Sequence, residues 1–205
     1  MPSDDASARP PGGDPDDPPL AEPERRRLLT LARGSIRHGL DTGGPLHVDL
    51  GAEPEPLRAT RAAFVTLHLA GALRGCIGHL EAVQPLALDV CENAYAAAFR
   101  DPRFAPVQPA EFDRLHIDIS VLTPARPIAF ASEDELLAAL EPGIDGVILT
   151  DGAGARRGTF LPTVWEQLPR REDFLAHLKM KAGLSPDHWS ERMRAWRYRT
   201  ECFGE

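Results

Sequence analysis

Cys76 lies in the segment of this chain whose residue types are best suited to chemistry, LRGCIGHL over residues 73–80. A cation close to a thiol, as Arg74 is here, favours the thiolate, which is the nucleophilic form of cysteine. Gly75 and Gly78 allow a ligand to approach the backbone closely, where N–H groups can stabilise developing negative charge. The segment therefore predicts an activated thiol at Cys76, with Arg74 as the residue that activates it.

Cys76 also has two other interpretations. Most free cysteines behave as small buried apolar side chains, which would make the motif structural. Cys76 and His79 form a C-x-x-H pair, which is half of a zinc site. The remaining candidate ligands have no suitable spacing, so we expect no metal: His68, Cys91 and His116.

The glycines of this region do not form a phosphate-binding loop. Gly71, Gly75 and Gly78 lack the G-x-G-x-x-G spacing, and no G-K-[ST] follows them. The G-x-S-x-G motif of serine hydrolases is also missing from the sequence. We therefore expect no nucleotide and no other cofactor.

Composition limits the class of protein. The 205 residues are 42% hydrophobic and 26% charged, as in soluble globular proteins. The net charge of −8 argues against nucleic acid as a partner. No apolar run approaches the roughly 20 residues of a membrane span, and residues 1–19 do not resemble a secretory signal. The three cysteines have no disulfide spacing, which indicates a reducing cytoplasm.

Hydrophobic periodicity predicts interspersed helices and strands after a Pro-, Asp- and Gly-rich tail over residues 1–20, which we expect to be disordered. We expect helices over residues 24–39, 85–99, 133–140 and 172–183, and strands over 63–69, 117–121, 146–151, 158–161 and 195–203. Residues 152–154 fit a hairpin turn. Frequent hairpin-like connections predict an α+β fold with a mostly antiparallel or mixed sheet flanked by helices.

Two further features have both a structural and a functional interpretation. Asp101 and Arg103 fit an ion pair that locks the turn after residue 99, and they also fit a polar pocket. Trp165 fits a side chain of the core beside a helix start, and it also fits the lining of a pocket. The residue types alone leave both alternatives open.

Several segments together resemble the AMMECR family, whose prokaryotic members are called AmmeMemoRadiSam system protein A. The sequence LRGCIG over residues 73–78 resembles the family signature. Further segments agree in order: NAYAAAFRDPRF over 93–104, IDISVLTP over 117–124, GTFLPTVWEQLP over 158–169, FLAHLKMKAGL over 174–184 and WRYRTECF over 196–203. The resemblance extends from about residue 22 to the end of the chain.

This resemblance implies one α+β domain over residues 21–205, with a larger lobe, a smaller lobe and a cleft between them. The cysteine motif is expected near that cleft. The biochemical activity of the family is not settled. Its bacterial name refers to a genomic association with a Memo-like protein and a radical SAM protein, which are therefore the partners that the resemblance implies.

The family motifs map onto this chain with two departures. His79 stands where the resemblance leads us to expect Ser or Thr, and His116 stands where it leads us to expect an acidic residue. A Cys76–His79 pair would therefore be particular to this chain, and the family's chemistry cannot depend on it. The matching positions are Arg74, Gly75, Cys76, Gly78, Asp101, Pro102, Arg103, Phe104, Phe160, Leu161, Pro162, Trp165, Lys181, Gly183 and Tyr198.

Two functions of different classes stay open. In the first, the protein is an enzyme in which Cys76 attacks an electrophilic carbon of a small molecule or a protein, and Gly75 and Gly78 supply N–H groups for the negative charge. Arg103 or Lys181 would hold an anionic substrate. In the second, the protein is a non-catalytic partner of Memo-like and radical SAM proteins, and the motif shapes a binding surface. Regulation through oxidation of an exposed thiol is a third, weaker hypothesis.

Overall fold

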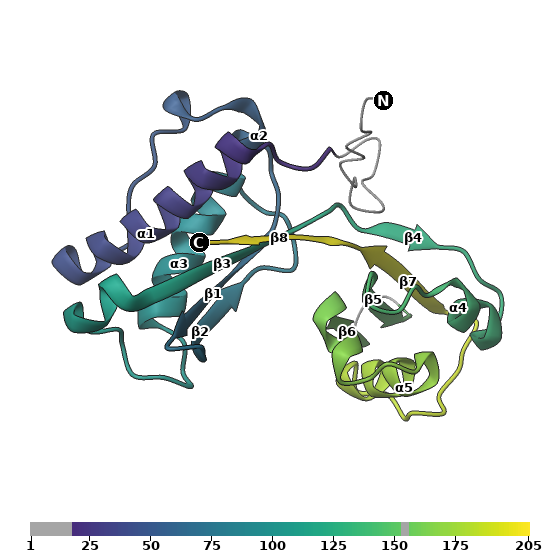
Figure 1. Ribbon diagram of the computed structural model, residues 1–205. Coiled ribbons are helices and arrows are strands. Elements are labelled where there is room, and N and C mark those ends of the chain that lie inside the picture. Colours follow the sequence, from purple (N-terminus) through teal and green to yellow (C-terminus); the bar gives the residue numbers. More distant parts are fainter. Residues whose placement is uncertain (1–17, 153–155) are drawn as a thin grey trace, which may run out of the picture.

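A computed structural model describes residues 18–152 and 156–205 of the chain. It contains helices and two four-stranded sheets, which Figure 1 shows side by side with helices packed on each. All strand pairs among these residues are antiparallel, so the fold is α+β, as the sequence predicted.

Sheet 1 has the strand order β2-β1-β3-β8. Its strands are β1 (Ala63–Leu69), β2 (Ala72–Gly78), β3 (Leu115–Leu122) and β8 (Thr200–Gly204), and its helices are α1 (Glu22–Thr42), α2 (Glu55–Arg58) and α3 (Leu86–Phe99). Short 3-10 helices lie over Leu50–Ala52 (η1) and Pro109–Arg114 (η2). Apolar side chains of α1 and α3 cover one face of the sheet and form its core with alternate residues of β1 and β3.

The hairpin between β1 and β2 sets the position of the cysteine motif. Ala70 and Gly71 both have positive φ, at 52° and 80°, as a two-residue type I′ turn requires. The register that follows pairs Cys76 with Thr66 and Gly75 with Leu67. β2 lies at the edge of sheet 1, so one side of its backbone has no neighbouring strand.

Sheet 2 has the strand order β4-β7-β5-β6. Its strands are β4 (Arg126–Ile128), β5 (Gly146–Asp151), β6 (Arg156–Phe160) and β7 (Met193–Tyr198), and its helices are α4 (Glu133–Ala139), η3 (Pro162–Glu166) and α5 (Arg171–Lys181). Its core is separate from that of sheet 1. Trp165 belongs to this core, where its ring stacks on Phe174 with centroids 3.7 Å apart.

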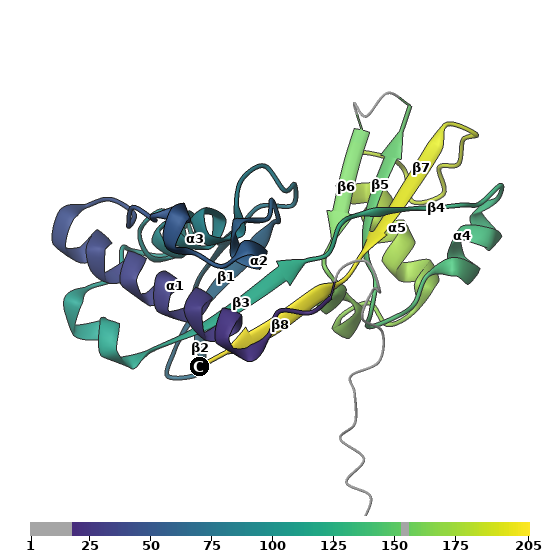
Figure 2. The ribbon, with the colours of Figure 1, turned by 90° about the horizontal axis from the view of Figure 1, so that it is seen from above.

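The chain passes between the sheets twice, from β3 to β4 and from β7 to β8, and Figures 1 and 2 show both connections running together. They are hydrogen bonded to each other, because the Thr123 N–H donates to the Arg199 carbonyl at 2.9 Å and the Arg199 N–H donates to Thr123 Oγ1 at 2.8 Å. A small apolar cluster that includes Ala62, Leu122, Ile148 and Tyr198 packs one sheet against the other.

The predicted single strand over residues 195–203 is wrong. It consists of β7 in sheet 2 and β8 in sheet 1, with Arg199 between them. The alternation of apolar residues continues across this crossing, so the sequence pattern does not mark it. The predicted strands over 63–69 and 146–151 agree with β1 and β5, and the helix over 85–99 agrees with α3 within one residue.

Two other predictions fall largely outside the described residues. They are the disordered tail, of which only residues 18–20 are described, and the hairpin turn at residues 152–154, of which only Gly152 is described. At the end of the predicted tail, Leu20 is buried against the core of sheet 1. Within the described residues, no helix combines the length and apolarity needed to cross a membrane.

Candidate functional site

Cys76 lies on the face of sheet 1 opposite α1 and α3. Gly75 points to the helices, because a Cβ added there would overlap the backbone carbonyl of Ala97 in α3. Side chains alternate along a strand, so Cys76 and its partner Thr66 point the other way. The thiol is half-buried and accepts a hydrogen bond from Thr66 Oγ1 at 3.3 Å.

The turn after α3 holds the backbone of Cys76 at the edge of the sheet. The Cys76 N–H donates to Asp101 Oδ2 at 2.9 Å, and the Cys76 carbonyl accepts from Arg103 Nη2 at 3.2 Å. Arg103 also forms a two-pronged ion pair with Asp101, at 2.9 and 2.6 Å. This pairing, together with the backbone hydrogen bonds, keeps the pKa of the buried Asp101 carboxyl well below its usual value.

Arg103 is also the cation that is hydrogen bonded to Cys76, at its backbone carbonyl. Asp101 first, and Cys76 as well, raise the pKa of the Arg103 guanidinium. The guanidinium of Arg74 points to a different partner: it forms two hydrogen bonds to Glu111 of η2, at 2.8 and 3.0 Å, and a third to the Ala105 carbonyl. Arg74 in turn lowers the pKa of the Glu111 carboxyl. Arg74 therefore connects η2 to β2 through these hydrogen bonds.

A polar cluster on the face of Cys76 joins two histidines that the sequence did not connect with the thiol. His68 follows Thr66 by two residues on β1, so it shares the face of Cys76, and its Nδ1 lies 3.0 Å from Asp118 Oδ2 on β3. His116 Nε2 lies 3.5 Å from the other oxygen of Asp118. We call this surface the open face; its polar residues are Thr66, His68, Cys76, His116, Asp118, Ser120 and Cys202, each half-buried or exposed.

His79 belongs to a different site, because Cys76 lies on the open face whereas His79 turns toward α3. His79 Nδ1 lies 2.6 Å from Oδ1 of Asp89, whose side chain is only 1% exposed. Asp89 also accepts hydrogen bonds from the Ala63 N–H at 2.8 Å and from Asn93 Nδ2 at 2.9 Å. His79 and His116, the two departures from the family pattern, thus have separate carboxylate partners.

Lys181 is brought together with His79 at the junction of the sheets. Both line a pocket of about 520 Å³ with the loop over residues 80–83 and with Arg157, Gly158 and Thr159 of β6. The Lys181 ammonium lies 5.0 Å from the centre of the Phe160 ring. Cys76 and Arg103 are not among the residues that line this pocket, so the predicted site residues occupy two places.

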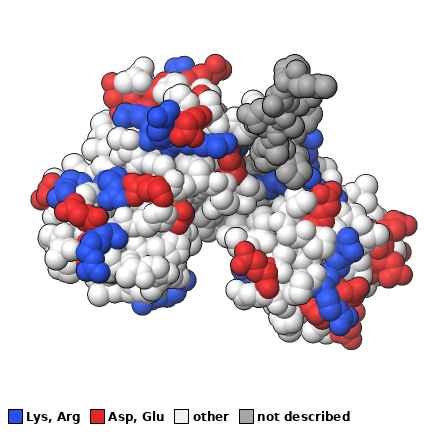
Figure 3. Space-filling view, in the orientation of Figure 1, with Lys and Arg blue, Asp and Glu red and all other residues white. Residues whose placement is uncertain are grey.

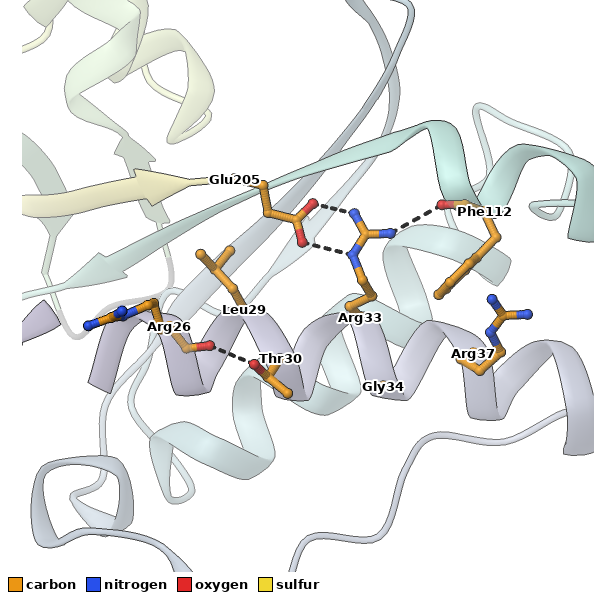
Figure 4. A pocket seen from close by; sticks show the side chains of 8 residues that line it. All are labelled: Arg26, Leu29, Thr30, Arg33, Gly34, Arg37, Phe112 and Glu205. Carbon is orange, nitrogen blue, oxygen red and sulfur yellow. Dashed lines mark hydrogen bonds and ion pairs between the residues drawn. The ribbon is translucent and has the colours of Figure 1, made fainter. Parts of the chain in front are cut away.

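Two more pockets lie on the described surface. One of about 390 Å³ adjoins the His79 pocket and shares Leu80, Glu81 and Arg157 with it. The other, of about 580 Å³, lies along α1 (Figure 4), where Arg33 is held by the Glu205 side chain and the Phe112 carbonyl. On the face drawn in Figure 3, basic and acidic side chains are interspersed.

Comparison with known proteins places this architecture in a family. A model of the AMMECR1 family matches residues 29–203. The chain belongs to the AMMECR1 family. A protein of Methanothermobacter thermautotrophicus is 38% identical over 195 residues, covering 91% of this chain and 97% of the relative. Protein MJ0810 of Methanocaldococcus jannaschii is 39% identical over 195 residues, covering 87% and 93%.

A solved structure agrees with the fold of this AMMECR1-family chain. The crystal structure of uncharacterized protein PH0010 from Pyrococcus horikoshii matches with a TM-score of 0.78 and 34% identity, over 91% of this chain and 93% of that one. Because that protein is described as uncharacterized, the likeness supplies an architecture and no activity. The function of the AMMECR1 chain must be argued from its own residues.

Proposed function

We propose that this AMMECR1-family protein is a cytoplasmic enzyme that uses Cys76 as a thiolate nucleophile. The observation that carries the proposal is the fixed position of its thiol. Asp101 and Arg103 hold the backbone of Cys76 on both sides, while the side chain is half-buried on the open face. In this proposal the two sheets, with their helices, act as two lobes of one domain over residues 21–205, and substrate enters where they meet.

The reaction needs a base and a group that favours the thiolate. The guanidinium of Arg103 would favour the charged sulfur, in place of the Arg74 that the motif suggested. Cys76 pairs with Thr66, and His68 lies two residues further along β1, so His68 is the diagonal neighbour of Cys76 across the two strands. A side chain as long as histidine can span that separation, and Asp118 orients the His68 ring. The thiol proton would pass to His68, and the sulfur electron pair would form a bond to the electrophilic, double-bonded carbon of a small molecule or a protein side chain. The π-electron pair of that double bond would move to its heteroatom, where the negative charge develops.

The test is the rate at which iodoacetamide alkylates each cysteine, followed by mass spectrometry across pH. Cys202 is an internal control, since it is exposed on the same open face. We expect Cys76 to react faster than Cys202 at neutral pH despite its lower exposure, and His68→Gln to slow Cys76 alone. A Cys76 that reacts more slowly than Cys202 would show that the thiol is structural.

A second candidate function has its own observation. Leu80 and Val83 both line the His79 pocket and are 37% and 68% exposed, so they place exposed apolar surface together at one site, as interaction surfaces do. An accessory protein that docks a Memo-like or radical SAM partner would use such a surface. In that case Leu80→Ser with Val83→Ser would abolish binding of the purified partner, whereas Cys76→Ser would leave it unchanged.

A further inference from the structure

The His79–Asp89 pair has the geometry of an oriented imidazole facing a pocket. Asp89 is completely buried, and besides His79 it is bound by the Ala63 N–H and by Asn93. Its position is therefore fixed by β1 and α3. It holds His79 Nδ1 at 2.6 Å, which leaves Nε2, the atom on the other side of the ring, without a hydrogen bond among the described residues. With Nδ1 held by Asp89, Nε2 is the ring nitrogen that a ligand in the pocket can reach.

Lys181, at the end of α5, brings a second polar group to the same pocket from the side of sheet 2. Within the described part of the chain its ammonium takes part in no ion pair and lies over the face of Phe160. Arg157, the other cation of the pocket, is paired with Glu81. One net positive charge, from Lys181, therefore faces the pocket in addition to the His79–Asp89 pair.

The remaining lining determines what kind of anion would fit. Leu80 and Val83 add exposed apolar surface beside these polar groups. Water covers such surface at a cost in free energy, and an apolar part of a ligand would displace it. A volume of about 520 Å³ falls in the range of small-molecule sites.

We infer that this pocket binds a small carboxylic acid with a short apolar chain, and that His79 and Lys181 both donate hydrogen bonds to its carboxylate. The apolar chain lies against Leu80 and Val83. Because His79 follows β2 of sheet 1 and Lys181 ends α5 beside sheet 2, the bound acid joins the halves of the molecule. The inference does not depend on the proposed thiol chemistry, since Cys76 does not line the pocket.

The lysine content of the chain allows a direct test on the intact protein. The sequence has two lysines, and Lys179 is fully buried and paired with Glu133 at 2.8 Å. An amine-acetylating reagent should therefore label Lys181 and leave Lys179 unlabelled. Hexanoate, with hexanamide as the neutral control of the same length, is the probe. We expect hexanoate to protect Lys181 from acetylation and hexanamide to give no protection.

Affinity measurements by calorimetry on variants complete the test. Lys181→Met and His79→Gln should each weaken hexanoate binding about tenfold, the usual effect of losing one charge-assisted hydrogen bond. Arg156→Met, an exposed cation on β6 outside the pocket lining, should have no effect. Equal protection by hexanoate and hexanamide, no protection by either, or an equal loss of affinity in Arg156→Met would each overturn the inference. None of these results depends on the reactivity of Cys76.

Discussion

The carboxylate of Asp101 accepts a hydrogen bond from the backbone N–H of Cys76, at 2.9 Å. An edge strand normally leaves such groups to water or to another chain. Here the turn after α3 closes the edge at Cys76, the proposed nucleophile. The position of the thiol is therefore coupled to an ion pair 25 residues further along the chain.

Replacing Asp101 by Asn should lower the free energy of unfolding by about 2 kcal/mol, because hydrogen bonds to a charged group typically contribute that much. The measurement is urea unfolding followed by circular dichroism. Asp113→Asn is the matched control, since the Asp113 side chain is 87% exposed and its pairing with Arg37 is loose. That control should change stability by less than about 0.5 kcal/mol.

The Asp101–Arg103 pair makes the free energy of unfolding depend on pH, and the direction follows from the pKa of Asp101. The pKa of Asp101 is lowered in the folded state, so its contribution to stability is complete above the ordinary aspartate pKa, about 3.9, and is lost as pH falls below that value. The stability difference between the wild type and Asp101→Asn should therefore shrink on acidification. A difference that stays constant down to pH of about 2 would show that the pairing is not the cause.

The two arginines near the motif should have different effects on Cys76. Arg103→Gln removes the cation beside the thiol and should slow alkylation of Cys76 several-fold at neutral pH. Arg74→Gln breaks the contacts with Glu111, so it should lower stability and leave the alkylation rate of the folded protein nearly unchanged. If Arg74→Gln slowed alkylation of Cys76 and Arg103→Gln did not, Arg74 would be the activating residue.

Gly75 is required for packing against α3. Gly75→Ala would place a methyl group against the Ala97 carbonyl, and overpacking of this kind costs about 2 kcal/mol. Gly44→Ala is the control, because a Cβ there meets nothing within 4 Å. Thermal unfolding of both variants should show a loss for Gly75→Ala only.

Cys91 should be inert in the folded protein. Burial between α1 and α3 raises the pKa of its thiol to about 12, with a smaller contribution from Glu53. At pH of about 8 the thiolate fraction is then roughly a thousandfold below that of an unfolded cysteine. Mass spectrometry should detect alkylation of Cys91 only after urea is added, and labelling without urea would mean that the helices separate readily.

The sequence predicts those parts of the fold that local patterns determine. The ends of β1, β5 and α3 follow from alternation, helical periodicity and the proline before α3. The pairing of Arg74 with Glu111 was not predictable, because a contact between residues 37 apart leaves no periodic pattern. The resemblance to a family found the cysteine motif, and only the structure placed the guanidinium of Arg103, rather than that of Arg74, against Cys76.

The His79 site was likewise predictable in part: the sequence pointed to His79, and the contacts of His79 with distant residues came from the structure. His79 was noticed because it departs from the family pattern, but its partner Asp89 was not. A signal was present, since Asp89 and Asn93 are polar residues four apart and so share one side of α3, where both are buried among apolar residues. Lys181 and His79 are 102 positions apart, and only the packing of one sheet against the other brings them to one pocket.

The hydrogen-bonded crossing at Thr123 and Arg199 has a consequence for the gene. Residues 126–198 form an insertion within a host made of the earlier strands and of β8. A stop codon anywhere within the insertion removes β8 as well, and it leaves β3 of the host as a bare edge. An in-frame excision of the insertion, in contrast, keeps all four strands of the host encoded.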